Sequence, residues 1–103
     1  MIQQFQHKIT QIKRRVDALD RSFNRENSIR EIREDLLVGN DFSTRISHFL
    51  LEQARICELL PKEEIGPAKA KFQKISKDFR SIQQDFSIVK DLANKKIEAA
   101  DEW

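Results

Sequence analysis

The sequence has no tyrosine, only two glycines and two prolines, and a single cysteine, Cys57, in 103 residues. A lone cysteine excludes an internal disulfide and is typical of a reducing compartment. So few turn-forming residues argue against a β-sheet protein. No apolar run is long enough for a transmembrane helix, and the first residues lack the hydrophobic core of a signal peptide. We expect a soluble, cytosolic chain.

The chain also has no large excess of positive or negative side chains. The 19 basic and 17 acidic side chains leave a formal net charge of +2, which gives little long-range attraction for nucleic acid or anionic lipid. The 39% hydrophobic and 35% charged residues form a balance typical of long amphipathic helices. At this length we expect one domain over residues 1–103, just large enough to bury its own core.

Apolar residues recur at steps of three and four along the first segment, without a miss from Ile2 to Phe23. Solvent-type side chains fill the positions between them, so the spacing predicts an amphipathic helix over about residues 2–24. The predicted apolar face consists of Ile2, Phe5, Ile9, Ile12, Val16, Leu19 and Phe23.

A second helix is predicted over about residues 28–60. Ser28 and Glu31 have the spacing of a capping box, in which the serine oxygen accepts from a helical N–H and the glutamate reaches back. Pro61 ends the helix, because proline disfavours helical geometry in the residue before it.

The apolar face of this second helix shifts by about one position near Gly39–Asn40. An unbroken register would instead place Gly39, Ser43 and Gln53 on the face. A bend or an over-wound turn at Gly39–Asn40 would reconcile the two halves, and a loop there is the alternative. The predicted face is Ile29, Ile32, Leu36, Phe42, Ile46, Phe49, Ile56 and Leu60, with Leu50 and Cys57 beside it.

The stretch PKEEIGP, residues 61–67, is predicted to be a short connection. Pro67 suits a first helical position and Gly66 a permissive cap, which predicts a third helix over about residues 67–100. Its apolar face is predicted to contain Ala68, Phe72, Ile75, Phe79, Ile82, Phe86, Val89, Leu92, Ala93, Ile97 and Ala100.

Three long helices with short links run up, down and up around one core. The sequence therefore predicts an all-α fold, an antiparallel up-down-up three-helix bundle with a left-handed twist. Because three apolar faces can cover one another, we expect a monomer. All seven phenylalanines lie on the predicted faces: Phe5, Phe23, Phe42, Phe49, Phe72, Phe79 and Phe86.

Residues that could support catalysis or metal binding are few. His48 and Cys57 point to opposite sides of a continuous helix, and Cys57 is expected to be a small buried residue. His48 and Glu52 have i,i+4 spacing, but two ligands do not make a metal site. His7 also points outward, and no glycine-rich phosphate loop is present. We expect neither an enzyme nor a bound metal or cofactor.

Five basic residues cluster in the stretch KAKFQKISKDFR, residues 69–80. A nucleic-acid groove needs exposed aromatic residues or a sustained basic face. Here the interleaved aromatic residues are expected in the core, so no nucleic acid is expected. A weak phosphate- or lipid-binding bundle is an alternative. The basic residues are Lys69, Lys71, Lys74, Lys77 and Arg80.

Two stretches, ISKDFRSIQQDF (residues 75–86) and SIREIREDL (residues 28–36), carry a family resemblance. They resemble the third helix and the start of the second helix of the syntaxin N-terminal domain. Ser87 departs from the usual glutamine, and Lys90–Asp91 replace a common Gln-Arg pair. The matching residues are Lys77, Asp78, Phe79 and Phe86 in the third helix, and Glu31, Ile32, Arg33 and Leu36 in the second.

The resemblance implies the regulatory three-helix (Habc) domain of a Qa-type SNARE, similar to endosomal or vacuolar syntaxins. The implied partners are the protein's own SNARE helix, SNARE partners, and Sec1/Munc18-type or tethering proteins at the cytosolic face of the membrane. Neither the SNARE helix nor the anchor of such a protein lies within these residues. We expect a partner helix between the second and third helices, near Phe49, Leu50, Lys71 and Lys74. The alternative is a structural module that self-associates through a surplus apolar face.

Overall fold

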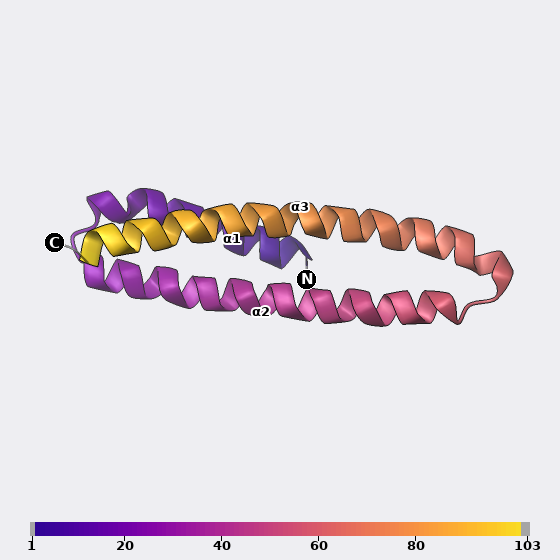
Figure 1. Ribbon diagram of the computed structural model, residues 1–103. Coiled ribbons are helices and arrows are strands. Elements are labelled where there is room, and N and C mark those ends of the chain that lie inside the picture. Colours follow the sequence, from indigo (N-terminus) through magenta and orange to yellow (C-terminus); the bar gives the residue numbers. More distant parts are fainter. Residues whose placement is uncertain (1, 102–103) are drawn as a thin grey trace.

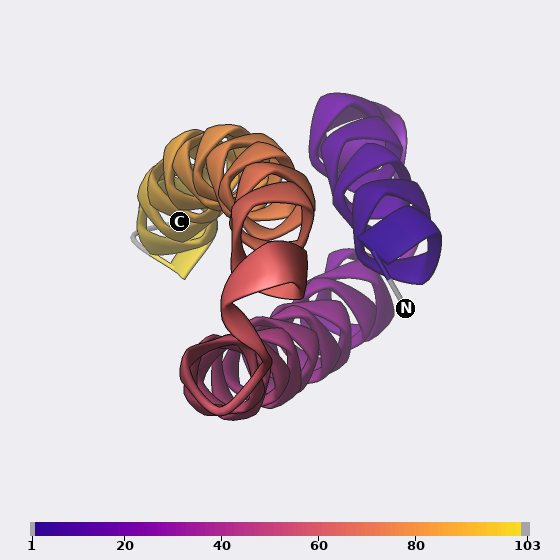
Figure 2. The ribbon, with the colours of Figure 1, turned by 90° about the vertical axis from the view of Figure 1, so that its right-hand side faces the viewer.

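The computed structural model describes residues 2–101, and all regular secondary structure in this range is helical. Helix α1 (Ile2–Ala18) continues into a 3₁₀ turn, η1 (Leu19–Arg21), and is followed by α2 (Arg25–Glu58) and α3 (Lys62–Asp101). Successive helices run in opposite directions (Figure 1) and lie at the corners of a triangle in the end-on view (Figure 2). The predicted all-α three-helix bundle is confirmed.

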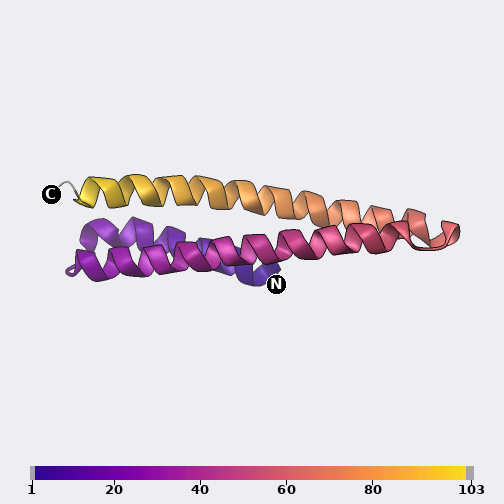
Figure 3. The same ribbon diagram turned by 60° about the horizontal axis from the view of Figure 1, so that its bottom comes forward.

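The three helices differ greatly in length, with 17 residues in α1, 34 in α2 and 40 in α3. At a rise of 1.5 Å per residue α3 is about 60 Å long, which matches the longest dimension of the molecule, 61 Å. Helix α1 is only about 26 Å long and lies beside one half of the hairpin formed by α2 and α3 (Figure 3). We call that part the three-helix half, and residues 47–75 the two-helix half.

Phe5 lies where all three helices meet. Its side chain is fully buried, and its ring centroid is 6.4 Å from that of Phe42, 6.2 Å from Phe79 and 5.3 Å from Phe86. The tilted and edge-on orientations of these rings are those that aromatic pairs prefer. The other buried apolar side chains are Ile9, Ile12, Val16, Leu19, Ile29, Ile32, Leu36, Ile46, Leu50, Cys57, Ile82, Val89, Ala93 and Ile97.

Gly39 lies inside an unbroken helix, so the loop considered at Gly39–Asn40 is not present. The glycine is buried against Phe86. A Cβ atom at Gly39 would lie 2.6 Å from Phe86 Cε1 and 2.7 Å from Phe86 Cζ. The missing side chain therefore allows the ring of α3 to rest directly on the backbone of α2.

The apolar face of α2 keeps its early register along the whole helix, so the predicted shift is wrong. The observed face is Ile29, Ile32, Leu36, Gly39, Ser43, Ile46, Leu50, Gln53 and Cys57, and the half-buried Phe42 packs beside it against the core, as predicted. Leu50, predicted to lie beside the face, is buried within it. Phe49 and Ile56, predicted on the face, are instead 52% and 49% exposed. On α3, Ile75 and Leu92 are also partly exposed rather than buried.

One charged side chain is buried between α1 and α2. The Asp35 carboxylate accepts hydrogen bonds from Lys8 Nζ at 3.3 Å and Arg15 Nη1 at 2.8 Å. A further ion pair, from Lys96 Nζ to Asp20 at 3.1 Å, joins α3 to η1. Because a buried carboxylate is costly without partners, the Asp35 contacts help to fix where α1 lies along α2.

The link between α1 and α2 differs from the prediction at both ends. The backbone leaves the helical conformation at Ser22, so Phe23 is fully exposed rather than part of the core. Asn24 caps α2, since its side-chain oxygen accepts from the Asn27 N–H at 3.1 Å. The capping box predicted at Ser28 is therefore not formed. Ser28 lies inside the helix, where its hydroxyl is hydrogen-bonded to that of Ser22 at 2.6 Å.

Helix α3 begins five residues before its predicted start. The Pro61 carbonyl accepts from the N–H groups of Glu64 at 2.9 Å and Ile65 at 3.2 Å. The predicted connection thus forms the first turns of the helix, which begins at Lys62. Pro67 lies within these turns and removes one backbone donor near the helix end.

Gly39→Ala tests the close packing of Phe86. The added methyl group meets a buried ring that Phe5 confines on another side, so the free energy of unfolding should fall by about 1–3 kcal/mol. This loss should outweigh the preference of helices for alanine over glycine, which is about 1 kcal/mol. Urea unfolding followed by circular dichroism measures the change.

Gly66→Ala is the matched control. Apart from its chain neighbours and the adjoining helical backbone, no atom lies within 4 Å of a Cβ at Gly66. Alanine gains helix propensity there, but Pro67 disfavours the helical conformation in a preceding residue that has a Cβ, so the free energy of unfolding should change by less than about 1 kcal/mol. Equal effects at Gly39 and Gly66 would contradict the contact with Phe86.

Two phenylalanines test the register of the apolar faces. Phe79 is 3% exposed, so Phe79→Ala should lower the free energy of unfolding by about 3–5 kcal/mol. Phe49 is half exposed, and Phe49→Ala should cost less than about 1 kcal/mol. Urea unfolding of the two variants side by side measures both. Similar losses would mean that Phe49 packs in the core.

Candidate functional site

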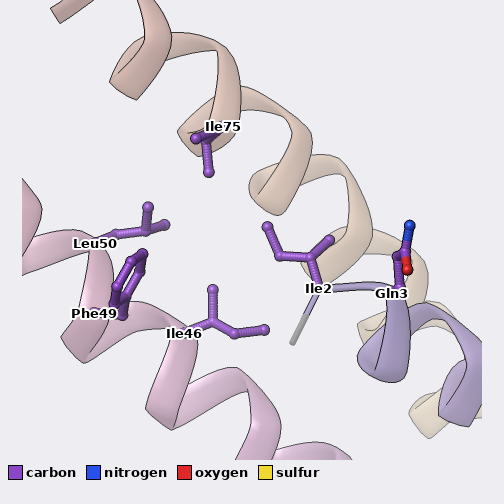
Figure 4. Close-up of a pocket in the computed structure, with 6 residues that line it drawn as sticks. All are labelled: Ile2, Gln3, Ile46, Phe49, Leu50 and Ile75. Atoms are coloured by element: carbon purple, nitrogen blue, oxygen red, sulfur yellow. The ribbon is translucent and has the colours of Figure 1, made fainter. Parts of the chain in front are cut away.

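An open apolar cavity of about 400 Å³ lies between α2 and α3, next to the start of α1. Figure 4 shows side chains from all three helices around it: Ile46 and Phe49 of α2, Ile75 of α3 and Ile2 of α1. Gln3 is the single polar residue in its lining. The cavity can therefore hold apolar side chains but offers few hydrogen-bonding partners.

A second cavity, of about 300 Å³, continues the first toward the end of the hairpin. The two cavities share Phe49, Leu50 and Ile75, so they form one trough, which we call the distal groove. Gln53 and Lys71 are the polar residues of the second cavity. The distal groove is lined by Ile2, Gln3, Ile46, Phe49, Leu50, Gln53, Ile56, Cys57, Leu60, Ala68, Lys71, Phe72 and Ile75.

The distal groove exists because two helices alone cannot enclose a core. In the three-helix half, α1 covers the space between α2 and α3. Beyond Ile2 no helix within residues 2–101 covers the same space. Phe49, Ile56 and Ile75 are consequently between 41% and 52% exposed. Contiguous exposed apolar side chains of this kind mark interaction surfaces.

The α3 wall of the distal groove is basic. Residues 66–77 contain four lysines and no acidic residue, and all four lysine side chains are exposed. Lys71 lines the groove, and Lys74 lies about one turn further along the same helix. On α2, Glu52 and Arg55 are exposed in the same half of the molecule but line neither cavity. The groove therefore combines an apolar floor with one positively charged edge.

The four site residues predicted from the sequence lie in different environments. Phe49 and Lys71 line the distal groove from opposite helices. Leu50 forms part of its floor and is buried, so its predicted position beside the apolar face rather than on it is wrong. Lys74 is exposed but is not among the residues that line the cavities.

Several residues of the groove, among them Ile2, Ile56 and Ile75, were assigned to the core from the sequence alone. The signal that could have found them is the difference in predicted length between the first helix and the other two. A helix over residues 2–24 cannot cover two helices that each span more than thirty residues.

The residues considered for catalysis do not form a site. His7, His48 and Glu52 are exposed, whereas Cys57 is a buried free thiol in the floor of the distal groove. Among the described residues no three His, Cys, Asp or Glu side chains lie close enough to hold a metal ion. In the same range, no helix combines the length and the apolar character needed to cross a bilayer.

Comparison with protein-family models, with curated proteins and with solved structures finds no match for this chain. The distal groove and the residue pattern therefore carry the functional argument.

Hydrogen exchange should distinguish the two halves of the molecule. Without a third helix the two-helix half has fewer buried contacts, so we expect its amides to exchange at least about tenfold faster than those of the three-helix half. Mass spectrometry of peptides from residues 47–58 and 62–75, against 29–46 and 79–97, measures the difference. Uniform protection along α2 and α3 would contradict the expected division.

Proposed function

We propose that this chain is a regulatory protein-binding domain of a Qa-type SNARE, which binds a helix of its own protein or of a partner in the distal groove. The observation that carries the proposal is the open, continuous apolar groove between α2 and α3. Its floor has the chemistry that an amphipathic helix buries. The resemblance of residues 75–86 and 28–36 to syntaxin N-terminal domains supplies the family.

The groove supports binding rather than catalysis. Its lining contains one thiol, Cys57, and one amine, Lys71, from opposite helices, together with two amides. A helix-in-groove contact needs only an apolar floor and compatible edges. Recruitment of other helices suits such a surface, whereas bond-making chemistry would require an activated nucleophile with a base beside it.

Membership of the Qa-type SNAREs would give the domain a regulatory role in the full protein. The domain would fold back on the downstream SNARE helix, or recruit Sec1/Munc18-type and tethering proteins, at the cytosolic face of an endosomal or vacuolar membrane. A membrane anchor would come from the same protein outside these residues. The proposed role involves no binding of nucleic acid.

A second candidate function is self-association as a structural module. Leu51 and Leu59 are 65% and 84% exposed in the two-helix half, outside the lining of the distal groove. These side chains add apolar surface that a second copy could cover. Sedimentation at micromolar concentration distinguishes the candidates, since a stable dimer favours self-association and a monomer favours the regulatory domain.

The test of the proposed function begins with the parent gene. A downstream heptad helix with a central glutamine, followed by a hydrophobic anchor, is expected. That helix, made as a peptide, is then titrated into the isotope-labelled domain. We expect amide chemical-shift changes to gather at the distal groove, around Phe49, Ile56 and Ile75.

Three outcomes would count against all or part of this proposal. A parent gene without such a helix would remove the SNARE assignment. Shifts confined to α1 would show that the SNARE helix does not use the distal groove. If no binding occurs at high micromolar concentration, the domain does not hold its own SNARE helix, and only separate partners would remain.

A further inference from the structure

The distal groove continues the interface that α1 already makes. The side chain of Ile2, at the first position of α1, forms the end of the 400 Å³ cavity. On the opposite side the face of α2 that packs in the core continues from Ile46 to Leu50 and Cys57 in the groove, with the polar Gln53 between the last two. A helix in the groove would therefore lie in line with α1 and pack on the same face of α2.

The dimensions of the groove fix the length of this helix. Its α2 wall extends from Ile46 to Leu60, which is about 21 Å at 1.5 Å per residue. An occupant of about 14 residues, or four turns, would fill it. Its apolar side chains must recur at steps of three and four, because the floor follows that spacing at Ile46, Leu50, Gln53 and Cys57.

The charged residues along the distal groove differ from those along the space that α1 occupies. Helix α1 has four basic residues and one acidic residue, and it packs where Asp35 accepts from Lys8 and Arg15. In the distal groove Lys71 lines the cavity from α3 instead, and the exposed Lys74 lies beside it on the same helix, outside the lining. A second helix of the same charge as α1 would meet repulsion there.

We propose that the distal groove binds an acidic amphipathic helix of about four turns, in line with α1, whose carboxylates pair with Lys71 and Lys74. The inference rests on the proposed function, in that it takes the distal groove as the partner site. It adds the charge, the length and the axis of the partner helix. The pairing of opposite charges selects the partner, while burial of apolar side chains supplies most of the affinity.

Two synthetic peptides test the charge preference. Both have about 14 residues and leucines at steps of three and four. One has glutamate at the flanking positions and the other has lysine. In low salt the glutamate peptide should bind at least about tenfold more tightly, and the difference should shrink as salt is added. Isotope-labelled domain reports both the affinity and the location, and shifts are expected around Phe49, Ile56 and Ile75.

Charge reversal on the domain supplies the matched control. The double variant Lys71→Glu/Lys74→Glu should invert the preference, so that the lysine peptide binds more tightly. Lys13→Glu/Lys95→Glu changes the net charge equally but alters exposed residues of the three-helix half. That variant should keep the preference for the glutamate peptide. Circular dichroism checks that each variant stays helical.

The outcomes separate this inference from the proposed function. Equal binding of both peptides in the groove, or an unchanged preference in the Lys71/Lys74 variant, would overturn the charge assignment while leaving a helix-binding groove. Shifts outside the groove would overturn its location. Failure of both peptides to bind at high micromolar concentration would count against the groove itself, and so against the inference and the proposed function alike. A stable dimer that covers Phe49 and Ile56 would overturn the inference by making a second copy the occupant.

Discussion

The contact of Phe86 with Gly39 fixes how closely α2 and α3 approach and in which register they pack. One side of the Phe86 ring faces backbone that has no Cβ atom, and the ring centroid is 5.3 Å from that of Phe5. All three helices therefore meet at one level through a single ring. Since α2 is a continuous helix through Gly39, its buried face keeps one register to Cys57. The same register turns Phe49 and Ile56 out of the core, so packing in the three-helix half determines the surface of the two-helix half.

The regular faces of α1 and α3 could be read from the sequence because their apolar residues recur with few interruptions. In α1 every predicted position from Phe5 to Leu19 is buried, and in α3 the same holds for Phe79, Ile82 and Phe86. Local spacing suffices there, since the helical period alone decides which side chains share a face.

The register of α2 could not be read in this way. A glycine counts as a gap in a hydrophobic pattern, yet Gly39 occupies a core position because Phe86, distant in the sequence, fills the space of its missing side chain. The predicted start of α2 is wrong for a related reason. Asn24 and Ser28 are both good N-caps, and only the path of the link between α1 and α2 decides between them. The candidate site could be predicted only in part. The sequence points to Phe49 and Lys71, but the groove that they line is open because α1 is short.

Opposite charges along the space between α2 and α3 explain how α1 and a second helix could both pack there without exchanging places. Lys8 and Arg15 are two turns apart on α1 and both contact Asp35, so a displacement of α1 along this space would separate at least one of them from a buried carboxylate. The same movement would bring the basic residues of α1 toward Lys71. Burial alone does not distinguish the two positions, because apolar contacts have no preferred direction. The ion pairs with Asp35 and the ring contact of Phe5 with Phe86 supply the distinction, and they hold α1 in place while the distal groove stays open.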